Sequence, residues 1–136
     1  MCGFDLKITY LKNGWAELSA AAGGSDLVLF FEYVPNDPIF ELLESAIKIS
    51  GRIGSVLVFY NCSQRNILKV SYVNDTTCRI EADNIRADLP VKAYCRAILR
   101  MFDTYIYQYS VDDYLNNWLG FPNNELEKLR AIYHNL

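Results

Sequence analysis

PVKAYCRAILRMFDTYIYQY, residues 90–109, carries the longest helical pattern in the chain. Its apolar residues recur at spacings of four and three, which is typical of a helix with one buried face. These residues are Val91, Cys95, Ile98, Phe102, Tyr105 and Tyr109. Four more widen that face beyond the narrow seam of a coiled coil, namely Tyr94, Leu99, Met101 and Ile106. We therefore expect this helix to lie across a broad surface, such as a β-sheet.

Two groups of strands are predicted on the amino-terminal side of this helix, because short runs of apolar residues alternate there with polar ones. They cover residues 4–10, about 15–22 and 27–34, and then 56–60, 67–73 and 78–82. The sequence places a helix between the two groups, starting at Asp37-Pro38 and ending at Gly51. Both faces of residues 27–34 are largely apolar, which predicts a central strand. The last strand has one polar side and is expected at an edge.

Two shorter helices are predicted after the long one, over residues 110–119 and 125–135. No linker, low-complexity run or change of composition divides the chain. The order βββαβββααα predicts one α+β domain over residues 1–136, with a mainly antiparallel sheet of about six strands packed against helices.

The first two strands are joined by a turn sequence, Lys12-Asn13-Gly14. A two-residue loop would pair Tyr10 with Glu17. A three-residue loop with Gly14 in the left-handed conformation would pair Ile8 with Leu18 and keep one face of the hairpin apolar. We favour the three-residue loop. It gives the hairpin an outer face composed of Lys7, Thr9, Leu11, Trp15, Glu17 and Ser19.

Length and charge exclude several classes of function. The 136 residues are 51% hydrophobic, enough for one ordinary core, and the formal net charge is -3. That charge argues against a nucleic-acid partner, because phosphate binding needs clustered Lys and Arg. The chain also lacks a signal-peptide pattern and an apolar run long enough to cross a membrane. We expect a cytoplasmic protein without a membrane partner.

The residues of common catalytic and metal sites are scattered or missing. The four cysteines form no CxxC pair and the chain has a single histidine, His134, so we expect reduced thiols and no metal site. No phosphate-binding loop, GxSxG or HExxH motif occurs. Neighbouring carboxylates such as Asp112 and Asp113 fit helix caps and solvated faces. The sequence therefore predicts a protein without a catalytic residue or a cofactor.

The outer face of the first strands carries the least expected composition. Trp15 and Phe30 would share it with Glu17 and Glu32, which gives aromatic rings bordered by carboxylates, as in protein interfaces. Three acidic residues of the first predicted helix could extend this region, namely Asp37, Glu41 and Glu44. Two interpretations are open: either a helix covers this face, or these seven residues bind a partner.

A resemblance favours the second interpretation. The segment 33–38, YVPNDP, leading into Leu42-Leu43, and the carboxyl-terminal pattern resemble small bacterial proteins of unassigned role. The carboxyl-terminal pattern consists of Tyr114, Trp118, Phe121-Pro122, Leu126 and Leu129. Compact, acidic chains without catalytic motifs also resemble the immunity proteins of contact-dependent and other polymorphic toxin systems. The resemblance implies a non-catalytic cytoplasmic inhibitor that binds a cognate toxin domain, often a nuclease, and blocks its active site.

Two other classes of function remain open. A small-molecule-binding domain or an enzyme could use a pocket between the sheet and the long helix. Four tyrosines could place hydroxyl groups there, namely Tyr60, Tyr72, Tyr94 and Tyr105. A self-associating structural protein is the third possibility.

Overall fold

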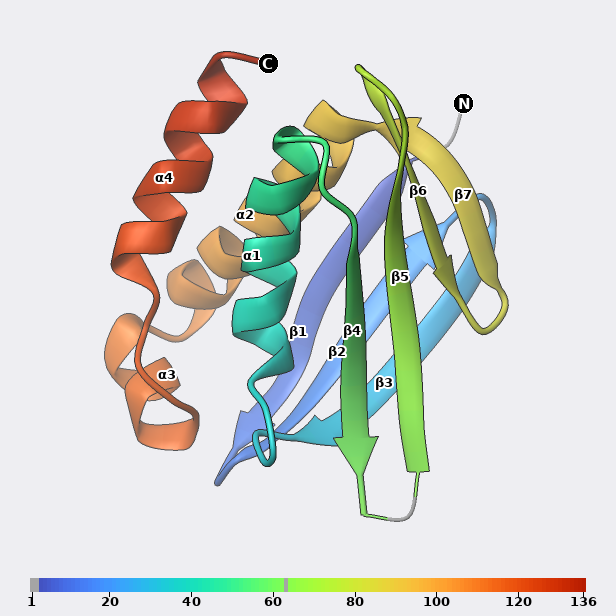
Figure 1. Ribbon diagram of the computed structural model, residues 1–136. Coiled ribbons are helices and arrows are strands. Elements are labelled where there is room, and N and C mark those ends of the chain that lie inside the picture. Colours follow the sequence, from blue (N-terminus) through green and yellow to red (C-terminus); the bar gives the residue numbers. More distant parts are fainter. Residues whose placement is uncertain (1–2, 63) are drawn as a thin grey trace.

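The computed structural model describes residues 3–62 and 64–136, and its strands form two antiparallel sheets (Figure 1). The first sheet has the order β1-β2-β3; its strands are β1 (Phe4–Lys12), β2 (Trp15–Ala22) and β3 (Ser25–Glu32). The second has the order β4-β5-β6-β7; its strands are β4 (Ser55–Asn61), β5 (Gln64–Asn74), β6 (Thr77–Ala82) and β7 (Ile85–Pro90). The α+β class predicted from the sequence is confirmed.

The helices lie together on one side of the molecule (Figure 1). They are α1 (Pro38–Ser50), α2 (Val91–Gln108), α3 (Val111–Asn117) and α4 (Asn123–His134). The predicted long helix is confirmed as α2, which packs along β1 and against α1 and α4. Ser110 caps α3 as predicted, since its hydroxyl accepts from the Asp113 N–H at 3.0 Å. The side-chain cap expected at Asn123 or Asn124 does not form, because α4 begins at Asn123 after Pro122.

The sheet arrangement differs from the prediction in two respects. A seventh strand, β7, pairs with β6, so β6 is an inner strand and not the predicted edge. The strand predicted to be central, β3, lies at the end of its own sheet and beside β4 of the other. Its outward residues stay accessible as a result, with Val28 60% exposed.

The hairpin of β1 and β2 combines both predicted registers. Ile8 pairs with Leu18 as favoured above, yet Tyr10 pairs with Glu17. A bulge between Ile8 and Tyr10 adds one residue to β1 and reconciles the two registers. The predicted three-residue loop is wrong, because the residues that connect the strands are Asn13 and Gly14, both with positive φ.

The bulge exchanges the faces of two neighbouring residues. Leu11, predicted to point outward, is 8% exposed and belongs to the core, whereas Tyr10 is 46% exposed on the outer face. Beyond the bulge the alternation of β1 is simply reversed, since each further residue points to the opposite face. One extra residue therefore adds an aromatic ring to the protein surface.

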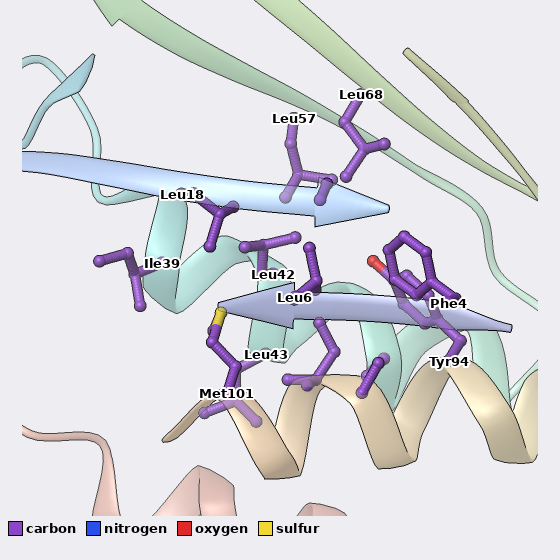
Figure 2. Close-up of a cluster of buried hydrophobic side chains, with 14 of the residues drawn as sticks. Phe4, Leu6, Leu18, Ile39, Leu42, Leu43, Leu57, Leu68, Tyr94 and Met101 are labelled. Atoms are coloured by element: carbon purple, nitrogen blue, oxygen red, sulfur yellow. The ribbon is translucent and has the colours of Figure 1, made fainter. Parts of the chain in front are cut away.

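One hydrophobic core fills the space between the sheets and the helices. Figure 2 shows side chains from both sheets meeting those of α1 and α2, with Leu18 and Leu57 near Leu42. At the centre of this core, the Tyr94 hydroxyl forms a hydrogen bond of 2.7 Å with the Ser45 hydroxyl and so ties α2 to α1. Because α1 packs against β4, β5 and α2, five of its seven buried residues belong to this core.

Candidate functional site: the outer face of the first sheet

The outer face of the first sheet is built by strand alternation and cross-strand pairing. Except at the bulge of β1, every second residue of these strands points away from the core. Trp15 pairs with Glu32, and Glu17 pairs with Phe30 on one side and Tyr10 on the other. Aromatic and acidic side chains therefore alternate across the sheet, as the sequence predicts for the four residues of this face.

Three rings and one branched side chain form what we call the aromatic patch, defined as Tyr10, Trp15, Val28 and Phe30. The Trp15 and Phe30 rings stack with centroids 5.1 Å apart at an angle of 11°, and Tyr10 lies 6.2 Å from Phe30. Phe30 is 40% exposed, and the helices pack against the opposite face of the sheet (Figures 1 and 2). No helix in the described part of the chain covers the patch.

Carboxylates outnumber ammonium groups on this face. Its acidic residues are Asp5, Glu17, Asp26 and Glu32, and its basic residues are Lys7 and Lys12. Local hydrogen bonds orient two of the carboxylates. Glu17 Oε1 accepts from the Thr9 hydroxyl at 2.8 Å, and Glu32 Oε2 accepts from the Cys62 N–H at 3.4 Å. The patch is therefore bordered by negative charge that is held in place.

Asp37 lies elsewhere and has a structural role. It caps α1, where its Oδ1 accepts from the Phe40 N–H at 3.1 Å and from the Trp118 Nε1–H at 2.9 Å. Burial raises the pKa of this carboxyl above its ordinary value of 3.8, and the hydrogen bond from Trp118 offsets part of that rise. The carboxylate thus joins the start of α1 to the end of α3.

Glu41 and Glu44 also lie on α1, away from the aromatic patch. Glu41 accepts a hydrogen bond of 2.9 Å from the Asn36 amide, which donates a second one to the Val58 carbonyl oxygen of β4, also at 2.9 Å. Glu44 borders a groove of about 410 Å³ between α1 and α4. Since α1 packs on the core side of the sheets, the acidic residues of α1 do not extend the acidic border of the patch.

A polar cleft of about 320 Å³ adjoins the aromatic patch. One wall is residues 9–12 of β1, and the other consists of Tyr105, Tyr109, Asp113 and Asn117 from the end of α2 and from α3. Tyr10 belongs to both the patch and the cleft. Sequence reasoning did not find this cleft, because its two walls lie about ninety residues apart in the chain and meet only when α2 packs on β1.

The four tyrosines considered for a pocket do not converge. Tyr94 is fully buried in the core, and Tyr72 is 44% exposed, where it donates to Asp75. Burial raises the pKa of Tyr105, and its hydroxyl donates to Asp113 in the cleft. Of the four, Tyr105 is the one that borders the cleft between β1 and the end of α2.

The described histidine, cysteine and acidic side chains lie apart from one another or are buried. Residues 3–62 and 64–136 hold no group of three or more His, Cys, Asp or Glu side chains placed to bind a metal ion. Cys62, Cys78 and Cys95 are free, and Cys2 lies outside the described residues. Burial raises the pKa of Cys78 to about 12, so its thiol keeps its proton. None of the helices in the same residues has the length and apolar character needed to span a bilayer.

Comparisons with known proteins leave the surface chemistry as the guide to function. No family model matches the chain, and the searches of curated proteins and of solved structures found no significant match.

Proposed function

We propose that this chain is a non-catalytic immunity protein that binds a cognate toxin domain in the bacterial cytoplasm and blocks its active site. The observation that carries the proposal is the aromatic patch, where the exposed Phe30 ring stacks on the half-buried Trp15 ring beside oriented carboxylates. Exposed apolar clusters with polar borders are typical of protein interfaces, in which Trp, Tyr and Phe are enriched. The resemblance to immunity proteins suggests a toxin domain as the partner.

Charge complementarity supports a basic partner surface. The acidic border of the patch would attract a toxin whose substrate groove is lined with Lys and Arg, as in nucleases. The rings would supply the contact area at the centre of the interface, where most binding energy resides. Neither the attraction by the acidic border nor the contact by the rings requires the protein to catalyse a reaction.

A growth-protection assay tests the proposal. Candidate toxin domains from neighbouring genes are co-expressed with the unsubstituted protein or with the Trp15→Ala/Phe30→Ala variant, and the affinity of each purified pair is measured. Loss of two central aromatic anchors should weaken binding ~100-fold or more and abolish protection. The variant should stay folded with a free energy of unfolding lowered by about 1–3 kcal/mol, because Phe30 is 40% exposed whereas Trp15 is half-buried and stacked on it.

Val56→Ala/Ile67→Ala is the matched control. Val56 and Ile67 lie on β4 and β5 of the second sheet and are 63 and 46% exposed. This control should keep both protection and affinity. A patch variant that loses stability but still binds, or a neighbouring toxin against which the unsubstituted protein gives no protection, would contradict the proposal.

The polar cleft supports a second candidate function, the binding of a small molecule between β1 and α2. A volume of about 320 Å³ is at the lower end for ligand pockets. A metabolite that binds there would raise the unfolding temperature in a thermal-shift screen. A single strong hit, together with no binding of the candidate toxin domain, would favour this second function over the first.

A further inference from the structure

The cleft contains a carboxylate held by its neighbours. The Tyr105 hydroxyl donates to Asp113 Oδ2, and the Asn117 amide lies 3.4 Å from Oδ1 and donates to the Asp113 carbonyl oxygen at 2.9 Å. The Asp113 N–H in turn donates to the Ser110 hydroxyl at 3.0 Å. A carboxylate offers about four acceptor positions. Asp113 is therefore oriented yet still able to accept bonds from a ligand.

Aromatic rings stand beside this carboxylate. The Tyr105 and Tyr109 rings lie 5.0 Å apart at an angle of 40°, and Tyr109 is 56% exposed. Tyr10, on the opposite wall, is 46% exposed. A guanidinium group suits such surroundings, because it pairs with a carboxylate through two parallel N–H bonds and stacks on aromatic faces. An ammonium group would satisfy the same carboxylate with less geometric selectivity.

The cleft adjoins the aromatic patch, which is the surface proposed to bind the toxin domain. Tyr10 is part of the aromatic patch and also lines the cleft, so a protein seated on the patch extends over the cleft mouth. We propose that the cleft receives an arginine side chain of that partner, with Asp113 pairing its guanidinium and Tyr109 stacking on it. This inference rests on the proposed function and specifies one contact of its interface.

Lys12 provides an opposing charge that makes the inference testable. It lies on the β1 wall of the cleft, and its ammonium repels a cationic guest but would attract an anionic one. Removing Lys12 must therefore strengthen the binding of arginine, whereas removing the charge of Asp113 must weaken it. A site for an anionic guest would respond in the opposite sense to both changes.

The experiment is an NMR titration of the whole protein with N-acetylarginine amide, followed through the backbone signals of Asp113 and Asn117. N-acetylglutamine amide and N-acetylglutamate amide serve as the neutral and anionic probes. We expect the arginine probe to shift these signals most. Asp113→Asn should lower its affinity ~10-fold or more, and Lys12→Gln should raise it ~2-fold or more. Asp112→Asn, an exposed neighbour on α3, is the charge-matched control and should change little.

Several outcomes would overturn the inference. One is that the arginine and glutamine probes shift the signals equally, and another is that the glutamate probe binds more tightly than the arginine probe. A third is that Lys12→Gln binds the arginine probe more weakly than the unsubstituted protein does. The last is that the arginine probe causes no shift at concentrations of tens of millimolar. The titration of the unsubstituted protein decides all of these except the Lys12→Gln comparison, even where a variant fails to fold.

The partner assay separates this inference from the proposed function. Asp113→Asn should weaken the toxin complex, whereas Asp112→Asn should not. If Trp15→Ala/Phe30→Ala abolishes protection while Asp113→Asn leaves affinity unchanged, the cleft inference is wrong and the proposed function stands. If Asp113→Asn weakens arginine binding but no toxin is bound, the proposed function fails while the cleft retains its affinity for guanidinium groups.

Discussion

Asp37 joins two segments of the chain that are eighty-one residues apart. Its carboxylate caps α1 and accepts from the indole N–H of Trp118, whose ring packs against Phe31 and Tyr33. The sequence predicted the start of α1 from Asp37-Pro38, and Trp118 is buried at 5% exposure. The contact between them could not be predicted, because it depends on how α3 folds back toward the start of α1.

The raised pKa of Asp37 leads to a prediction about pH. Because the folded protein binds this proton more tightly than the unfolded chain, stability falls as pH rises through the range just above 3.8. Asp37→Asn keeps an acceptor for both donors and removes the titration. The unfolding free energy of the unsubstituted protein, minus that of Asp37→Asn, should therefore decrease with pH in that range and then level off. Urea unfolding at a series of pH values measures this difference. Parallel curves of unfolding free energy against pH for the two proteins would refute the prediction.

Among the elements, the β1–β2 hairpin shows why register is harder to predict than strand position. Apolar alternation correctly paired Ile8 with Leu18, since that pairing keeps one face buried. The same sequence also contains an Asn-Gly turn, which requires a two-residue connection. Only a bulge satisfies both demands, and its position depends on the packing of Leu11 in the core. The alternation of apolar and polar residues alone did not locate the bulge.

The turn glycines of the first sheet give a second prediction. Gly14 and Gly24 share the same φ of +82°, but an added Cβ at Gly14 would lie 2.8 Å from the Tyr33 ring, whereas at Gly24 nothing lies within 4 Å. Gly24→Ala should cost about 1–2 kcal/mol for the left-handed conformation. Gly14→Ala should cost more, because the ring of Tyr33 must also move. Chemical unfolding of both variants compares them, and equal losses would contradict the proposed clash.

Strand β7, which the sequence analysis did not predict, changes the expected position of β6 in its sheet. Ile85, Ala87 and Leu89 are buried and alternate with Arg86 and Asp88, so the signal was present in the sequence. Without β7, the polar side of β6 predicts an edge strand and the chain contains six strands; the pairing of β7 with β6 changes both. The division into two sheets has no local signal, since it arises from the packing of β3 beside β4.

For the molecule as a whole, the distribution of charge is as informative as its net value. Residues 1–51 carry three Lys or Arg against seven Asp or Glu, and the first sheet belongs to this acidic part. The fold then divides these acids between the border of the aromatic patch and α1, where Asp37 is the cap and Glu41 and Glu44 are half-buried. The sequence predicted the composition of the candidate site, but the grouping of its residues required the packing of α1 on the core.

Charge reversal tests whether the acidic border steers a basic partner. Glu17→Lys/Glu32→Lys should slow association with the toxin domain ~10-fold or more at low salt, and the difference should shrink at 0.5 M salt because ions screen exposed charges. Stopped-flow mixing measures the rates. The control is Asp75→Lys/Glu127→Lys, which changes the net charge equally at side chains 67 and 77% exposed on other elements. Equal slowing by both variants would show that net charge alone matters.

The contact of Asn36 with β4 has a consequence for the behaviour of the protein in concentrated solution. β4 is a terminal strand of its sheet, and such strands can template the addition of strands from other molecules. The Asn36 amide occupies the Val58 carbonyl oxygen, which an incoming backbone would otherwise use. The chain can thus expose aromatic rings on one surface while the margin of β4, flanked by β3 and occupied at Val58, disfavours the addition of strands from other molecules.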